Sequence, residues 1–389
     1  MAVKNTFKKA TKRVGKAFGF SDVIDQIDKL KNSLDAANNQ LAKQNQKINF
    51  LSQSMAELVD SNQKILEHSK KVEKENELYF HALFKKANES DEEMRKRFFK
   101  SLPKASGGLL LIQQGNTKLF KIFNEICQKN KITYWTDGGT LLGAVRHQSS
   151  IPWDDDIDVC MMRDDIHKLE KVLENTDYHI TIVYDAVNVS KQLRFRNRNH
   201  NIPCFIDIFI YDYNSEDSET TWQDWLAKRK EILNSTYKSK DPMLIEWQNL
   251  IVVDHNDNTK LSKYLDKYYE DLYGDIFGDV HTGGPGKVIT AEEAQKNPTK
   301  FKYIIDGLDN LSPISRPHSS RVFKKDIIFP TKKLIYDGIH ISVPNNYEEY
   351  LHRMYGDYYE IPDDLVSHFR HIDRNILDQK AIQDYLESD

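Results

Sequence analysis

The sequence predicts an α/β (α+β) domain with a mixed sheet, preceded by a long N-terminal α-helical coiled coil. Apolar residues repeat in steps of three and four from residue 27 to residue 79 without a Pro or Gly, which is the pattern of a coiled coil. Beyond residue 109, short strand-like runs alternate with helical stretches, which is typical of a sheet covered by helices. The length of 389 residues allows two or three such structural units.

Residues 1–20 form a basic amphipathic segment with six Lys and Arg residues and no acid before Asp22. Apolar side chains at helical spacing would give this segment one apolar face, as in helices that lie on an anionic membrane surface. A basic, partly disordered tail is the alternative. The apolar face is thin because it lacks Trp and Leu.

Residues 21–85 are predicted to be the coiled coil, with Ile27, Leu34 and Leu41 at successive a positions of the heptad. Asn62 and Asn76 also fall at a positions, where Asn favours a defined register and most often a parallel dimer. We therefore expect self-association as a dimer, with a trimer or tetramer as alternatives. A long helix that folds back on its own domain is the other interpretation.

Residues 86–108 are interpreted as a charged helix end followed by a linker, because Pro103, Gly107 and Gly108 interrupt any continuous helix. Residues 109–389 form the predicted catalytic domain. A helix is expected over 109–130, and further helical stretches over 166–173 and 222–233. Strands are expected at 132–135, 157–161, 179–184, 191–196 and 204–212. The tail predicts a hairpin that turns at Asp337-Gly338 and a short helix after Pro344.

Charge and cysteine content narrow the class of protein. The 55 Lys and Arg residues against 59 Asp and Glu residues give a net charge of -4, so no nucleic-acid partner is expected. Three cysteines without C-x-x-C spacing argue against a disulfide framework. No run approaches the about 18 apolar residues of a transmembrane helix, and no signal peptide is evident. We expect a cytoplasmic protein, peripheral on the inner face of the cell membrane.

The predicted chemistry concentrates in residues 136–159, TDGGTLLGAVRHQSSIPWDDDIDV, where a strand ends and a helix-like stretch begins. Gly138 and Gly139 permit unusual backbone angles and close approach of a ligand. Thr140 is predicted to cap the following helix, whose first amides would then face an anion. These three residues are therefore candidate substrate-binding residues.

Asp156 and Asp158 point the same way if they lie on one strand, and Asp154 would join them if the strand began earlier. Asp207 is the single charge in the apolar run Phe205–Phe209, so it needs a partner when buried. Carboxylates gathered on one face repel each other unless a cation lies between them, and oxygen ligands select Mg²⁺ or Mn²⁺. Asp156, Asp158 and Asp207 are thus the predicted metal ligands and catalytic residues. A surface-acidic loop is the alternative interpretation.

Several arginines near this segment are candidates for diphosphate binding. Arg146 is expected to contact phosphate, with a salt bridge to a nearby Asp as the alternative. Arg194, Arg196 and Arg198 alternate on a predicted strand beside that of Asp207, and one of them is expected to be functional.

Three further features are weaker. His147 is interpreted as a loop histidine rather than a base, and Asp137 as either a partner of its own turn or a contact of the acceptor. HTGGPGK at 281–287 lacks the Ser or Thr and the spacing of a P-loop, so it is interpreted as an ordinary glycine loop.

The run GGTLLGAVRHxxxIPWDDDIDV resembles the signature of the LicD family, which is related to the fukutin group within the nucleotidyltransferase superfamily. The tail over 327–362, with its F-P, its vP-x-x-Y and its YGD, resembles the C-terminal portion of that family. The resemblance spans roughly residues 110–365 and implies a nucleotidyltransferase-like catalytic domain. It also implies that the superfamily pattern of two glycines and three carboxylates lands on Gly138, Gly139, Asp156, Asp158 and Asp207.

The resemblance further implies a metal-dependent transferase that moves a phospho-alcohol, such as phosphocholine or ribitol phosphate, from a CDP-activated donor to a glycan acceptor. In that scheme Asp156 and Asp158 bind Mg²⁺, and Asp207 completes the site or acts as base. One alternative is transfer of a nucleotide from an NTP to a small molecule or protein. The other is a coiled-coil scaffold with a non-catalytic domain.

Overall fold

The computed structural model divides the chain into two compact units, Met1–Ala87 and Asn88–Asp389. It describes residues 21–187, 189–215, 219–255, 259–277, 289–307, 321–360 and 379–388. The basic amphipathic segment over 1–20 and the glycine loop over 281–287 lie outside the described residues.

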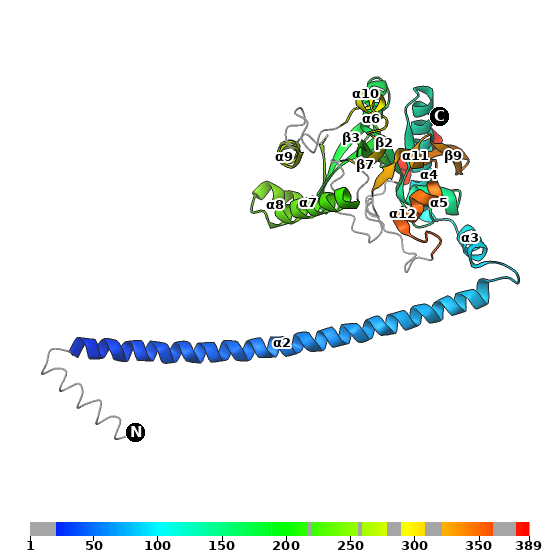
Figure 1. Cartoon of the computed structure of the whole chain (residues 1–389). Coiled ribbons are helices and arrows are strands. Elements are labelled where there is room, and N and C mark those ends of the chain that lie inside the picture. Colours follow the sequence, from blue (N-terminus) through cyan, green and yellow to red (C-terminus); the bar gives the residue numbers. More distant parts are fainter. Residues whose placement is uncertain are drawn as a thin grey trace. The chain divides into compact units, whose positions relative to one another are not determined.

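In its described part, the first unit is one long helix, α2 (Ser21–Phe84), which continues without interruption for 64 residues (Figure 1). The helix that the heptad pattern requires is therefore present. Its heptad apolar residues are exposed, as shown by Leu30 at 69% and Leu58 at 63% of their maximal accessible surface. Self-association through these residues stays a prediction.

The second unit is built on one mixed sheet of eight strands within the described part of the chain. The strands are β1 (Tyr134–Thr136), β2 (Asp158–Met162), β3 (Tyr178–Asp185), β4 (Ser190–Asn197), β5 (Phe205–Asn214), β6 (Val252–Asp254), β7 (Tyr303–Asp306) and β8 (Val322–Lys324). They follow the order β1-β2-β5-β4-β3-β6, and β7 pairs with both β5 and β8. β2 and β5 are parallel and the other pairs are antiparallel. The expected mixed α/β architecture is confirmed.

The helices of the second unit cover and flank this sheet. They are α3 (Asp91–Ser101), α4 (Gly107–Lys129), α5 (Gly138–Arg146), α6 (Arg163–Leu173), α7 (Glu219–Lys238), α8 (Pro242–Leu250), α9 (Lys260–Phe277), α10 (Ala291–Lys296), α11 (Lys325–Ile328), α12 (Tyr347–Tyr355) and α13 (Gln379–Glu387). Among the described residues, no helix combines the length and apolar character needed to cross a bilayer.

α4 packs on one face of the sheet. Phe123 of α4 lies edge-on to Phe195 of β4, with ring centroids 5.2 Å apart, and Phe195 pairs with Ile206 of β5. Successive residues of a strand point to opposite faces. The neighbours of these residues, Arg194 and Asp207, therefore point to the face of the sheet away from α4.

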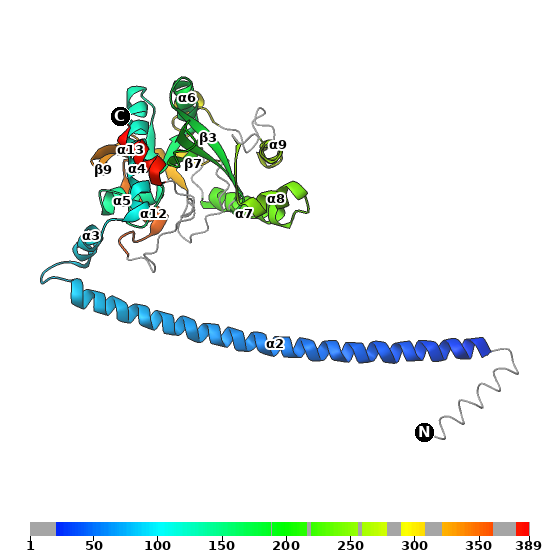
Figure 2. The same cartoon turned by 180° about the vertical axis from the view of Figure 1, so that it is seen from behind.

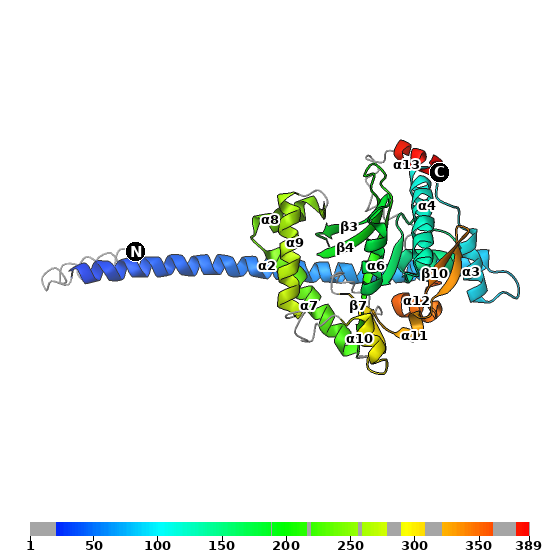
Figure 3. The same ribbon diagram turned by 90° about the horizontal axis from the view of Figure 1, so that it is seen from above.

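α8 and α9 lie beside β3 in every view, at the end of the sheet where β6 pairs (Figures 1, 2 and 3). α7 joins them by its second half, whereas its first half packs on β7 and β8 through Trp222 and Leu226. Their core includes Trp247, whose indole N–H donates to the Tyr184 carbonyl of β3 at 3.1 Å. These helices thus cover that end of the sheet, and they contribute none of the predicted site residues.

The predicted C-terminal hairpin is confirmed as β9 (Lys332–Tyr336) and β10 (Ile339–Val343), an antiparallel pair. Asp337 and Gly338 form its turn with φ angles of 46° and 80°, as a two-residue hairpin turn requires. α12 follows as predicted, and the Asn346 side chain accepts a hydrogen bond from the Glu349 amide.

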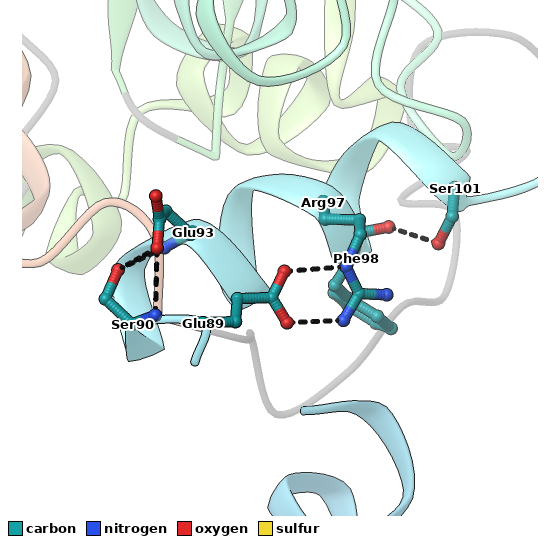
Figure 4. A network of polar contacts seen from close by, with 6 residues as sticks. All are labelled: Glu89, Ser90, Glu93, Arg97, Phe98 and Ser101. Carbon is teal, nitrogen blue, oxygen red and sulfur yellow. Dashed lines mark hydrogen bonds and ion pairs between the residues drawn. The ribbon is translucent and has the colours of Figure 1, made fainter. Parts of the chain in front are cut away.

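The interpretation of residues 86–108 as a linker is wrong for its central part, which forms α3. Ser90 caps this helix by a capping box with Glu93, and Glu89 makes a bidentate ion pair with Arg97 (Figure 4). Phe99 of α3 is fully buried. The charged residues concealed the helix because they form its exposed face and its cap, whereas few apolar residues mark the buried face.

Removing residues 1–87 is expected to leave the second unit folded, with a cooperative thermal transition close to that of the full chain, because α3 then remains. Removing residues 1–103 deletes Phe99 and is expected to lower the unfolding free energy by about 3–5 kcal/mol, the typical cost of losing a buried Phe side chain. Urea unfolding of the two truncated chains, followed by circular dichroism, measures the difference. Equal stability would show that α3 does not belong to this unit.

Candidate active site

Three neighbouring strands place charged side chains in one row across the sheet. Asp158 on β2 lies opposite Asp207 on the parallel strand β5, and Arg194 on β4 lies opposite Asp207 from the other side. Residues opposite one another in a sheet project from the same face. The pairing therefore brings together two predicted metal ligands that are 49 positions apart in the sequence.

Asp156 joins this row from the loop before β2. Asp156, Asp158 and Asp207 each offer a carboxylate oxygen, and these oxygens lie within 4.8 Å of one another. Asp156 also belongs to a second acidic group with Asp154 and Asp155. Clustered carboxylate oxygens suit a hard divalent cation such as Mg²⁺ or Mn²⁺.

Both glycines make room for these carboxylates. A Cβ at Gly138 would lie 2.4 Å from Asp158 Oδ2, and a Cβ at Gly139 would lie 2.0 Å from Asp154 Oδ2. Gly138 also has a φ of +53°, which favours glycine. The first turn of α5 therefore lies directly against the acidic cluster, and only residues without a side chain fit there.

Thr140 has a different role from the predicted helix cap. α5 begins at Gly138 after Asp137 as N-cap, so Thr140 already lies within the first turn. Its hydroxyl accepts a hydrogen bond from the Asp158 amide at 2.8 Å. Thr140 thus fixes the start of β2 and with it the position of the Asp158 carboxylate.

The electrostatics of the cluster fit a bound cation. Burial raises the pKa of Asp158 well above its usual value, and the charges of Asp156 and Asp207 raise it further. Concentrated negative charge of this kind is relieved by a divalent ion, which favours the ionised carboxylates. The residues present therefore fit Mg²⁺ or Mn²⁺.

The three alternating arginines separate into three environments. Arg194 donates from Nε to Asp207 Oδ1 at 2.8 Å, and its guanidinium lies over the Phe205 ring. Arg196 pairs with Asp254 of β6 at 3.0 Å. Arg198 lies beyond the end of β4 and donates to backbone carbonyls, so it does not share the face of the other two as predicted. Only Arg194 contacts the acidic cluster directly.

Arg146 lies away from the first turn of α5, and its contact with the donor phosphates stays a prediction. It ends α5, about 12 Å along the helix from Gly138 at 1.5 Å per residue. Its Nη1 donates to the Tyr358 carbonyl at 2.9 Å, and its guanidinium stacks on the Phe99 ring at 4.0 Å. Burial lowers its pKa to about 10. These contacts tie α5 to α3 and to the chain after α12.

His147 follows Arg146 and is also packed against aromatic rings. Its imidazole meets the Phe99 and Trp153 rings edge-on. Burial, and then the charge of Arg146, lowers the pKa of His147 to about 4. The side chain is therefore neutral at neutral pH, and its contacts are those of a packed loop histidine.

Asp137, the N-cap of α5, is a buried structural carboxylate. Its Oδ1 accepts a 2.7 Å hydrogen bond from the Tyr350 hydroxyl of α12, and its Oδ2 pairs with Arg321 at 3.3 Å. All three residues are buried. This contact anchors the glycine turn to the C-terminal part of the domain, which neither sequence interpretation of Asp137 anticipated.

Tyr350→Phe is expected to lower the unfolding free energy by about 1–3 kcal/mol, because it removes a donor from a buried carboxylate. Chemical denaturation measures the change, with Tyr347→Phe on the same helix as the control. Equal stability of the two variants would show that the Tyr350 hydroxyl does not support Asp137.

α4 contributes two positioning residues that the sequence analysis missed. Asn116 donates to the Asp155 carbonyl at 2.9 Å and accepts from the Phe205 amide at 3.2 Å, and so joins the acidic loop to β5. Gln113 donates to the carbonyls of Ile151 and Asp154. In the sequence, Gln113 and Asn116 are only two amide residues beside the apolar face of a predicted helix. This pattern does not reveal which distant backbone groups they bind.

Comparison with known proteins identifies the domain that carries this site. Residues 131–243 match the family model described as LicD/FKTN/FKRP, nucleotidyltransferase domain. The chain is 26% identical over 273 residues to the lipopolysaccharide cholinephosphotransferase LicD of Haemophilus influenzae, covering 64% of this chain and 91% of that protein. The chain contains a LicD-family domain.

Two shorter similarities concern the same family and one uncharacterized protein. A 41-residue stretch is 44% identical to the human ribitol 5-phosphate transferase FKRP, covering 10% of this chain and 8% of that protein. An uncharacterized protein of Rickettsia prowazekii is 44% identical over 79 residues, covering 19% of this chain and 29% of that protein. The LicD match over 131–243 includes both glycines and all three clustered carboxylates, whereas Asn116 and Tyr350 lie outside it.

Proposed function

We propose that this chain is a metal-dependent phosphotransferase that moves a phospho-alcohol from a CDP-activated donor to a glycan acceptor. The observation that carries the proposal is the convergence of Asp156, Asp158 and Asp207 within 4.8 Å, beside a glycine turn, inside a LicD-family domain. The relatives named as cholinephosphotransferase and ribitol 5-phosphate transferase support the class of group that is transferred.

Asp156, Asp158 and Asp207 would hold Mg²⁺ or Mn²⁺, and such an ion neutralises the charge that develops on a diphosphate during cleavage. Gly138 and Gly139 leave the first turn of α5 open to the phosphates, whose charge the helix N-terminus favours. Arg194 fixes the orientation of Asp207 through its 2.8 Å contact. These residues position the donor, which is the main requirement of phosphoryl transfer.

The proposed reaction breaks the bond between the bridging diphosphate oxygen and the phosphorus that carries the alcohol. The acceptor hydroxyl attacks that phosphorus in line, a new phosphodiester forms, and CMP leaves with the bridging oxygen. A carboxylate of the cluster accepts the proton of the attacking hydroxyl. Transfer of a nucleotide would instead require attack at the other phosphorus.

Incubation with Mg²⁺ and a panel of CTP, CDP-choline, CDP-ribitol and CDP-glycerol, with and without glycan acceptors, tests the proposal. We expect CMP release from at least one CDP-alcohol, increased by acceptor and abolished by EDTA. Release of pyrophosphate from CTP without cleavage of any CDP-alcohol would favour nucleotide transfer. Failure to cleave any of the four compounds would count against both reactions.

We also place this activity in the cytoplasm, at the inner face of the membrane. The support is the cluster of basic residues over 1–20, which would favour an anionic lipid surface. Vesicle binding that requires acidic lipid and decreases with added salt is expected. Equal binding to neutral vesicles would remove this part of the proposal.

A further inference from the structure

α2 carries a long stripe of exposed apolar side chains that the proposed reaction does not use. Ten aliphatic residues at a and d positions of the heptad are 39–69% exposed. They are Ile27, Leu30, Leu34, Leu41, Ile48, Leu51, Met55, Leu58, Ile65 and Val72. A large apolar surface with regular spacing usually marks a binding surface.

We propose that this stripe binds the same stripe of a second copy of the chain, in a parallel, in-register, two-stranded coiled coil. The stripe recurs every 3.5 residues along a helix of 64 residues, so a second helix can follow it over its whole length. A helix with such a repeat is complementary to itself. A second copy is therefore the occupant that the spacing selects.

The area of the stripe is sufficient for a stable pair. Burial of one aliphatic side chain removes roughly 100 Å² from water, a value implied by the usual transfer free energy per unit area. Ten such residues on each of two helices would bury on the order of 1,000–2,000 Å², which is the range of specific protein interfaces.

Polar residues within the stripe favour the parallel orientation. In a parallel pair each a residue faces its own copy, so Asn62 meets Asn62 and the two amides can hydrogen-bond to each other. In an antiparallel pair a residues face d residues, so Asn62 does not meet its own copy. Asn at an a position also specifies a defined register.

The parallel arrangement has a functional consequence. Both chains leave the coil at the same end, so each assembly carries two LicD-family domains that start from one point. Two linked sites on one acceptor-bearing surface raise the effective concentration of enzyme there. This assembly does not depend on which group the enzyme transfers.

Cysteine cross-linking of the full chain tests the orientation. The three native cysteines are buried and are not expected to compete. Under mild oxidation Leu58→Cys should form a covalent dimer, because position 58 faces its own copy at a d position. Gln46→Cys, on the opposite face of the helix, is the control and should not. If Leu58→Cys forms a disulfide only when mixed with Ile48→Cys chains, the pair is antiparallel and the proposal is wrong.

Light scattering tests the number of chains. We expect a mass of two chains for the full protein and of one chain after removal of residues 1–87. The double variant Leu51→Lys and Leu58→Lys should also give one chain, whereas Gln46→Lys with Gln53→Lys adds the same charge at outward positions and should leave two. Circular dichroism shows whether the variants remain folded. A single-chain mass for the native protein, or a mass of three or four chains, would overturn the proposal.

Discussion

Asp158→Asn is expected to lower turnover by about 10³-fold or more and to raise the unfolding midpoint of the metal-free protein at neutral pH. Loss of a metal ligand removes several kcal/mol of transition-state stabilisation, at about 1.4 kcal/mol for each factor of ten. The stability effect has the opposite sign because the pKa of Asp158 is raised by burial and by Asp156 and Asp207.

The sign follows from linkage. A carboxyl whose pKa is raised in the folded state contributes stability below its unfolded pKa of about 3.9 and loses that contribution as the pH rises through the folded value. At neutral pH the Asp158 carboxylate therefore destabilises the folded metal-free protein, and Asn removes this destabilisation. Mg²⁺ should stabilise the native protein and not the variant, because only the former retains the full ligand set.

Thermal unfolding in EDTA and in Mg²⁺, together with CMP release, measures both effects. Glu292→Gln removes one exposed carboxylate of α10 and should change neither. An Asp158→Asn protein that keeps near-native turnover would remove the metal assignment. One that is less stable than the native protein in EDTA would point to a structural role for this carboxylate.

Gly138→Ala is expected to lower turnover by about 100-fold or more and the unfolding free energy by about 1–3 kcal/mol. The left-handed φ of +53° costs a non-glycine residue about 1–2 kcal/mol, and the new Cβ would lie 2.4 Å from Asp158 Oδ2. The Asp158 carboxylate must therefore move away from the cluster. Displacement of a catalytic group by about 1 Å commonly costs 10²-fold in rate.

Gly338→Ala is a matched control for the stability lost when a residue other than glycine takes a left-handed backbone conformation. Gly338 has a φ of +80° in the hairpin turn, and an added Cβ there would meet no atom within 4 Å. This variant should lose similar stability and keep native turnover. If both variants keep native turnover, the glycine turn does not position the acidic cluster.

Strands β1 to β5 and the acidic cluster were predictable because their signals are local, whereas the short strands β6, β7 and β8 were not predicted. Asp207 is the single charge of an apolar run, and this isolation alone indicates a strand that carries a functional carboxylate. The alternation of polar and apolar residues in β4 and the Asp337-Gly338 turn are likewise signals that a few neighbouring residues carry. Because successive residues of a strand point to opposite faces of the sheet, the positions of Asp158 and Asp207 in their strands then decide that both point to the same face.

Other features depend on contacts between distant segments and could not be predicted. The direction of Arg146 is set by Phe99 of a helix that the charged composition concealed. Asp137 is held by Tyr350, more than 200 residues later in the chain. Asn116 binds backbone groups of two segments, and no pattern of spacing in a single sequence records such a contact.

The identity of the attacked phosphorus tests the proposed function most directly. The native protein is incubated with Mg²⁺ and a cleavable CDP-alcohol in ¹⁸O-labelled water, with water in place of the glycan hydroxyl, and the products are separated by mass. We predict the label in the phospho-alcohol and unlabelled CMP, because the nucleophile attacks the phosphorus that carries the alcohol. Label in CMP would show attack at the nucleotide phosphorus and would contradict transfer of a phospho-alcohol.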